Sequence, residues 1–200
     1  MDVRKTKTRP RILIAGLGNV LLRDDGIGVH AVRELRKDHS PGTLAVEVGT
    51  AVLDAFHLFE WADRILAVDA MKAGGLPGTI YISGIHDIEE PGSQASLHEL
   101  SLISVLGFLA SHRRPEVMVL GIEPDKIDYG LDLSSSLQAV IPGIIRVSKA
   151  ITGYWRTGLS LSGNTECLEA LLRPLNMNLR ERSDSGLLKE TLRERAGTAS

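Results

Sequence analysis

The alternation of apolar and polar stretches along the chain predicts strands and helices in an alternating order. Short apolar or alternating runs, bounded by glycine, proline or charged residues, are typical of strands. Such runs predict strands at 11–16, 43–48, 64–69, 79–83 and 116–122. Apolar residues at helical spacing predict helices at 26–37, 52–61, 97–111 and 134–155.

The order of these elements predicts the fold class. The run from Arg64 to Asp69 is almost continuously apolar, as expected of a central strand covered on both faces. Too few residues separate it from 79–83 for a crossover helix, so the strand at 79–83 is expected to be antiparallel. Pro142 should kink or restart the last helix. We therefore predict an α/β fold: a three-layer, mostly parallel twisted sheet of about five strands, one of them antiparallel, with helices on both faces.

Apolar density along the chain predicts one main domain. Residues 1–10 are expected to be a disordered tail, and residues 11–156 hold all the elements above. Residues 157–200 are expected to form a C-terminal extension that is disordered or partly helical, with a short exposed helix at 187–195. This extension is predicted to contribute little to the core.

Composition narrows the function classes. The chain has 200 residues, a net charge of −2 and 43% hydrophobic residues, which favours neither nucleic acid nor an anionic membrane as partner. No apolar stretch approaches the roughly 20 residues needed to span a bilayer. Cys167 is the single cysteine, which fits a reducing compartment, and we interpret it as an incidental thiol. We expect a cytoplasmic monomer.

A glycine-rich loop and two acids follow the first predicted strand. Gly16 and Gly18 allow a tight turn, and Asp24 and Asp25 come just before the first helix. Either acid could simply cap that helix. In open α/β sheets, however, binding sites form beyond the carboxyl ends of the strands, which is where this loop is expected to lie.

Two further residues are expected at the same edge of the sheet. Asp69 closes the third predicted strand and could simply form a turn with the amides of Ala70 and Met71. An unpaired acid after so apolar a strand is costly to bury, which favours a cleft. His98, on the first turn of the third helix, could be a solvent-facing residue. A helix N-terminus disfavours a positive charge, so a neutral imidazole there is suited to binding a metal.

Together Asp25, Asp69 and His98 form an O,O,N ligand set, which suits a divalent first-row ion such as nickel or zinc. Three protein ligands leave coordination positions open, as in a working site.

Other motifs do not fit. The loop at 16–18 begins like a dinucleotide fingerprint, but Leu21 stands where the third glycine should be. The sequence contains neither a phosphate-binding P-loop motif nor a Gly-x-Ser-x-Gly elbow. Four other histidines are scattered without the spacing expected of metal ligands: His30, His57, His86 and His112.

The segment 16–28 closely resembles the opening motif of the nickel-iron hydrogenase maturation endopeptidases. Similar motifs follow in order at 49–51, 68–70, 77–79, 96–100, 121–124 and 130–134. The resemblance covers about 11–155, and several ordered motifs are far more specific than any one of them.

The resemblance implies that residues 11–156 form a protease domain. It would remove a short C-terminal extension from a hydrogenase large-subunit precursor after nickel insertion. The metal-contacting residues of the family match Asp25, Asp69 and His98, although some members carry glutamate at the first position. The implied metal is nickel supplied by the substrate, for which zinc or another divalent ion could substitute.

Several alternatives stay open at this stage. Asp25 and Asp69 could act as a catalytic acid–base pair, or they could help a metal polarise the scissile carbonyl. The same ligands would also serve a non-catalytic nickel-site docking factor or metallochaperone. A nucleotide-binding regulatory domain would require a ligand at the loop 16–18.

Overall fold

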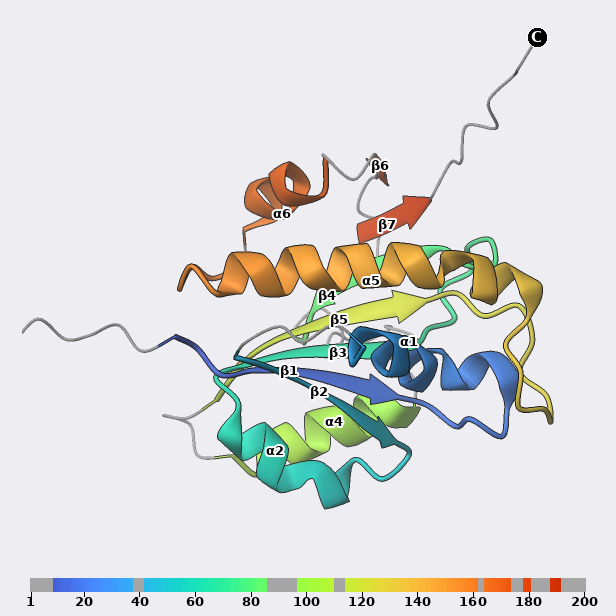
Figure 1. Ribbon diagram of the computed structural model, residues 1–200, viewed down its shortest axis with the longest axis horizontal. Coiled ribbons are helices and arrows are strands. Elements are labelled where there is room, and N and C mark those ends of the chain that lie inside the picture. Colours follow the sequence, from blue (N-terminus) through green and yellow to red (C-terminus); the bar gives the residue numbers. More distant parts are fainter. Residues whose placement is uncertain are drawn as a thin grey trace, which may run out of the picture.

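A computed structural model describes residues 9–37, 42–85, 97–109, 114–161, 164–173, 178–180 and 188–191 of the chain (Figure 1). The disordered tail was predicted for residues 1–10, and residues 1–8 of it lie outside this range, as do His86, His112 and much of the C-terminal extension.

The strands form one mixed sheet in the order β2-β1-β3-β5-β4-β7-β6. Their bounds are β1 Ile12–Leu17, β2 Thr43–Gly49, β3 Arg64–Ala70, β4 Ile80–Gly84, β5 Glu116–Ile122, β6 Asn178–Arg180 and β7 Leu188–Thr191. β1 pairs in parallel with β2 and β3, and β3 pairs in parallel with β5. β4 is antiparallel to β5. The five predicted strands and the antiparallel strand among them are therefore confirmed. Two strands that were not predicted, β7 and β6, extend the sheet beyond β4 by antiparallel pairing.

Helices cover both faces of this sheet (Figure 1). Their bounds are η1 Arg23–Gly26, α1 Ile27–Leu35, η2 Leu53–Ala55, α2 Phe56–Trp61, α4 Leu97–Gly107, α5 Ser135–Trp155 and α6 Thr165–Leu172. α1 and α5 pack on one face with one core cluster, while α2 and α4 pack on the other with a second cluster. The three-layer architecture is thus as predicted.

Burial along β1 shows why the chain folds this way. Ile12 and Ile14 join the core under α1 and α5, whereas Leu13, Ala15 and Leu17 join the core over α2 and α4. Successive strand residues point to opposite faces, so a run that is apolar throughout is stable only with both faces covered.

The C-terminal part of the chain departs from the prediction. Residues 188–191 form a strand against β4 and not a helix. Leu161, Leu168 and Leu172 are buried in the same core cluster as α5, so the segment after α5 does contribute to the core. α5 continues through Pro142 as one helix, so it does not restart there, and the alternative of a kink at Pro142 stays a prediction.

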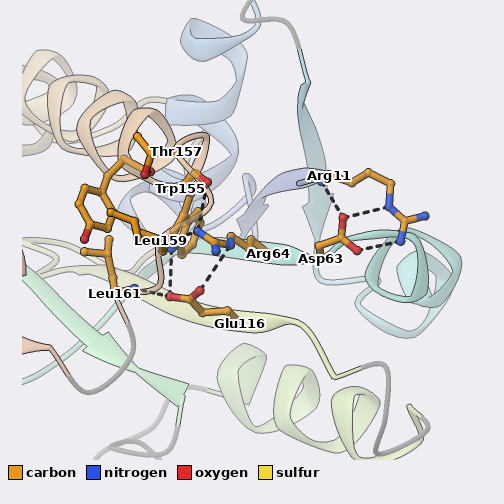
Figure 2. Close-up of polar contacts among 9 residues, drawn as sticks. Arg11, Asp63, Arg64, Glu116, Trp155, Thr157, Leu159 and Leu161 are labelled. Atoms are coloured by element: carbon orange, nitrogen blue, oxygen red, sulfur yellow. Dashed lines mark hydrogen bonds and ion pairs between the residues drawn. The ribbon is translucent and has the colours of Figure 1, made fainter. Parts of the chain in front are cut away.

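Figure 2 shows how the segment after α5 is attached at the amino end of β3 and β5. Arg64 Nε lies 3.4 Å from Glu116 Oε2, and both side chains are largely buried. The Arg64 guanidinium donates to the carbonyls of Trp155 and Leu159. Glu116 Oε1 accepts from the Trp155 indole at 3.0 Å and from the Leu161 N–H at 2.7 Å. One ion pair therefore fixes the direction in which the chain leaves α5.

The strand order also locates the site. β2 lies on one side of β1 and β3 on the other, while α1 and α2 cover opposite faces. The carboxyl ends of β1 and β3 therefore flank a topological switch point, where a crevice opens in folds of this kind.

Candidate functional site

Two glycines allow α1 to begin directly against the sheet. Gly18 has a φ of +107°, and a Cβ there would lie 1.7 Å from the carbonyl oxygen of Asp25. At Gly28, a Cβ would lie 2.0 Å from the carbonyl oxygen of Val68 in β3. Because both positions lack a side chain, the loop after β1 folds back tightly and places Asp25 near the end of β3.

Asp24 is fully buried and binds the loop before α5. Its Oδ2 accepts from the backbone N–H groups of Asp125 at 3.0 Å and Lys126 at 2.7 Å. Its Oδ1 accepts from the N–H of Ser134 at 2.7 Å. A carboxylate with several backbone donors is well suited to burial, since the donors replace its hydration. The role of Asp24 is thus to join two loops.

The carboxylate of Asp25 has different neighbours from that of Asp24. Its Oδ2 accepts from the Asn19 N–H at 2.8 Å, which tightens the loop, and lies 4.0 Å from His98 Nε2. The N-cap of α1 is Gly26, with no side-chain hydrogen bond to the cap, so neither acid caps this helix as the simpler interpretation proposed.

Asp69 is fully buried at the carboxyl end of β3. Its Oδ1 accepts from the Ala70 N–H at 2.9 Å, which is half of the turn considered above. The Met71 N–H donates instead to the carbonyl of Ile122 at 2.9 Å. Asp69 Oδ1 also lies 3.5 Å from His98 Nδ1, so its carboxylate faces the site as well.

His98 lies between the two carboxylates. It is on the first turn of α4, as predicted, and its side chain is 17% exposed. The three residues come from three separate segments of the chain, and the fold brings them together at one edge of the sheet. Within the part of the chain that the structure describes, no three His, Cys, Asp or Glu side chains are arranged to hold a metal ion.

Glu123 is a buried acid near this edge that sequence reasoning named only within a motif. Its Oε2 accepts from the N–H groups of Ala73 at 2.9 Å and Gly75 at 3.0 Å, and from the Tyr81 hydroxyl at 2.6 Å. Glu123 therefore holds the loop that follows Asp69. Burial raises the pKa of Tyr81, and the hydrogen bond to the Glu123 carboxylate raises it further. The sequence signal that could have identified Glu123 is its position directly after the apolar strand β5.

Fold and site together define a class: α/β proteins with an acid- and imidazole-lined site at the carboxyl edge of a mostly parallel sheet. The profile of the HycI hydrogenase maturation protease family matches residues 29–150, which include Asp69 and His98. The chain belongs to this family, as the motifs predicted, and it is an endopeptidase.

Individual relatives agree with the family match. The hydrogenase expression/formation protein HupD of Rhizobium leguminosarum bv. viciae is 30% identical over 166 residues, 78% of this chain and 80% of the relative. The hydrogenase 2 maturation protease of Escherichia coli K12 is 29% identical over 150 residues, 70% of this chain and 90% of the relative. The [NiFe] hydrogenase maturation protease HybD from Thermococcus kodakarensis superposes with a TM-score of 0.61 at 27% identity, covering 70% of this chain and 98% of that one.

One further finding concerns membranes. Among the residues described, no helix combines the length and the apolar character needed to cross a bilayer.

Proposed function

We propose that this protein removes the C-terminal extension of a nickel-iron hydrogenase large-subunit precursor after nickel insertion, and that Asp25, Asp69 and His98 recognise the metal. The observation that carries the proposal is the position of His98, 3.5 Å from Asp69 and 4.0 Å from Asp25. Two carboxylate oxygens and one imidazole nitrogen are suitable ligands for a divalent first-row ion.

The metal in this proposal belongs to the substrate. A metal delivered by the precursor requires only that the three side chains complete its coordination. Recognition of the finished metal site would then position the scissile bond, which by itself lowers the activation barrier. Nickel held by the precursor would add Lewis-acid polarisation of the peptide carbonyl.

Asp25 and Asp69 are the proposed catalytic residues. Asp69 is buried and Asp25 nearly so, with 16% of its side chain exposed, so a bound peptide would shield both from water. Either carboxylate could move a proton between the attacking water and the leaving amine, with His98 within reach of both. The metal-recognition and acid–base roles differ in one respect: only the first makes cleavage depend on nickel.

The experiment compares nickel-loaded with nickel-free precursor by intact-mass spectrometry after incubation with wild-type protein, Asp69→Asn or Asp63→Asn. Asp63 is a matched control, because it precedes β3 at the opposite end and pairs with Arg11 at 2.9 Å (Figure 2). Wild type and Asp63→Asn should shorten only the nickel-loaded precursor. Asp69→Asn should be slower by a factor of about 100 or more.

Other outcomes would change the proposal. Equal cleavage of nickel-free precursor would remove metal recognition and leave the acid–base pair. A precursor that binds the protein and stays intact would indicate a docking factor.

A further inference from the structure

Four exposed apolar side chains lie on the two loops beside Asp25. They are between 39% and 88% exposed, and we call them the apolar rim: Leu21, Ile127, Tyr129 and Leu131. Single exposed apolar residues are ordinary, but a group on adjoining loops is typical of an interaction site.

The backbone under the apolar rim is held firmly. The Arg23 N–H donates to the Gly130 carbonyl at 2.9 Å, and the Gly130 N–H donates to the Leu21 carbonyl at 3.0 Å. Arg23 Nε also lies 2.6 Å from Asp128 Oδ1. The buried carboxylate of Asp24 joins the same two loops. The rim is therefore a preorganised surface, and little conformational entropy would be lost when a partner binds to it.

The backbone conformation of Arg23 also supports an interaction site at the apolar rim. Arg23 has a φ of +49°, which residues with a side chain rarely adopt. Such conformations persist where the surroundings enforce them, and they concentrate at functional sites. Here the strained residue lies between Leu21 of the rim and Asp25 of the site.

The position of the apolar rim indicates what kind of partner would bind there. Figure 1 shows the β1–α1 loop and the loop before α5 side by side, at the end of the sheet to which the β1 and β5 arrows point. A partner that contacts both the rim and Asp25 must extend beyond the site itself, which a small molecule would not do. Exposed aromatic and aliphatic side chains on a rigid support are typical anchors for a protein surface.

We propose that the apolar rim docks an apolar surface on the folded body of the large-subunit precursor, outside the peptide that is cut. This inference rests on the proposed function, because it names the partner of the same site. It assigns binding to the rim and cleavage to Asp25 and Asp69.

The experiment measures steady-state cleavage of nickel-loaded precursor by the Tyr129→Ser/Leu131→Ser double variant. Phe108→Ser is the matched control, since Phe108 is 74% exposed but follows the far end of α4. The double variant should lower kcat/KM by about tenfold or more, chiefly through KM, while kcat at saturation stays within about twofold of wild type. Phe108→Ser should match wild type in both constants. Thermal unfolding should be unchanged in all three proteins, because the replaced side chains are exposed.

A kcat/KM of the double variant within about twofold of wild type would overturn the docking role. If wild type binds the precursor without shortening it, the proposed cleavage fails, and dissociation constants of the same variants still test the rim. If wild type and the double variant then bind the precursor with equal affinity, the docking role of the apolar rim is overturned. Failure of wild type to bind the precursor at all would overturn both proposals.

Discussion

Asp24 and Asp25 are neighbours in the chain, yet their carboxylates lie in different environments. Asp24 accepts three backbone N–H groups from the loop before α5, whereas Asp25 accepts one from Asn19 and faces His98. Two identical side chains thus have separable tasks, since one holds the loops together and the other reaches the site. Substitution of each by asparagine distinguishes these tasks.

Asp24→Asn should destabilise the protein, because a neutral amide is a weaker acceptor and its NH2 group would face backbone donors. We expect a loss of about 2–3 kcal/mol in the free energy of unfolding, measured by urea denaturation. Asp25→Asn keeps an oxygen for the Asn19 N–H and should change stability by less than about 1 kcal/mol while abolishing cleavage. Equal destabilisation by the two variants would contradict this division.

Glu123→Gln should loosen the loop that follows Asp69. Removal of the negative charge weakens three hydrogen bonds, so we expect a loss of about 1–3 kcal/mol in the free energy of unfolding. The pKa of Tyr81 should fall toward its ordinary value without reaching it, because burial, the larger cause, remains. Alkaline absorbance titration measures this change, with Tyr81→Phe as the control that assigns the signal. An unchanged Tyr81 titration would count against the hydrogen bond.

Gly28→Ala should be strongly destabilising, since the added methyl group would lie 2.0 Å from the Val68 carbonyl oxygen. α1 would have to move away from β3, at a cost of at least about 3 kcal/mol. Gly153→Ala is the matched control: this glycine lies inside α5, and a Cβ there meets nothing within 4 Å. The Gly153→Ala variant should gain about 0.5–1 kcal/mol in the free energy of unfolding, because alanine has a higher helix propensity than glycine. Thermal unfolding of both variants tests the contrast, which a destabilised Gly153→Ala would refute.

His30 should make stability depend on pH. Burial lowers the pKa of His30 below its ordinary value of 6.5, and the nearby positive charge of Arg33 lowers it further. Its Nε2 is buried and has no hydrogen-bond partner among the residues described. As the pH falls below 6.5, the unfolded chain therefore takes up the proton first, and wild type loses stability relative to His30→Gln.

This loss should continue until the pH passes the folded-state pKa, with a slope of at most about 1.4 kcal/mol per pH unit. Urea denaturation of both proteins between neutral and mildly acidic pH measures it. A difference that stays constant with pH would show that His30 titrates alike in both states.

The local pattern of apolar and polar residues was sufficient to predict much of the fold. The apolar run of β3 and the short connection to β4 predicted a central strand with an antiparallel strand after it, and both are present. The positions of Asp25, Asp69 and His98 at one edge followed from a rule about parallel sheets. Their chemical roles are still predictions.

Features that depend on distant parts of the chain could not be predicted. The three N–H groups bound by Asp24 lie 101 to 110 residues further along the chain, beyond any local pattern. Residues 188–191 belong to a stretch rich in leucine, lysine, glutamate and arginine, which favours a helix. Pairing with β4 overrides that preference, because tertiary contacts outweigh weak intrinsic propensities.

The contacts of Arg64 and Glu116 also constrain how the chain folds during synthesis. Both residues have been made before Trp155 and Leu161, which provide their partners after α5. Until those residues leave the ribosome, the ion pair lacks its backbone and indole partners, and Leu168 and Leu172 cannot complete the core against α5. The sheet can assemble early because domains begin to fold from the amino end. The core cluster around α5 is therefore complete only once the segment through Leu172 has been made.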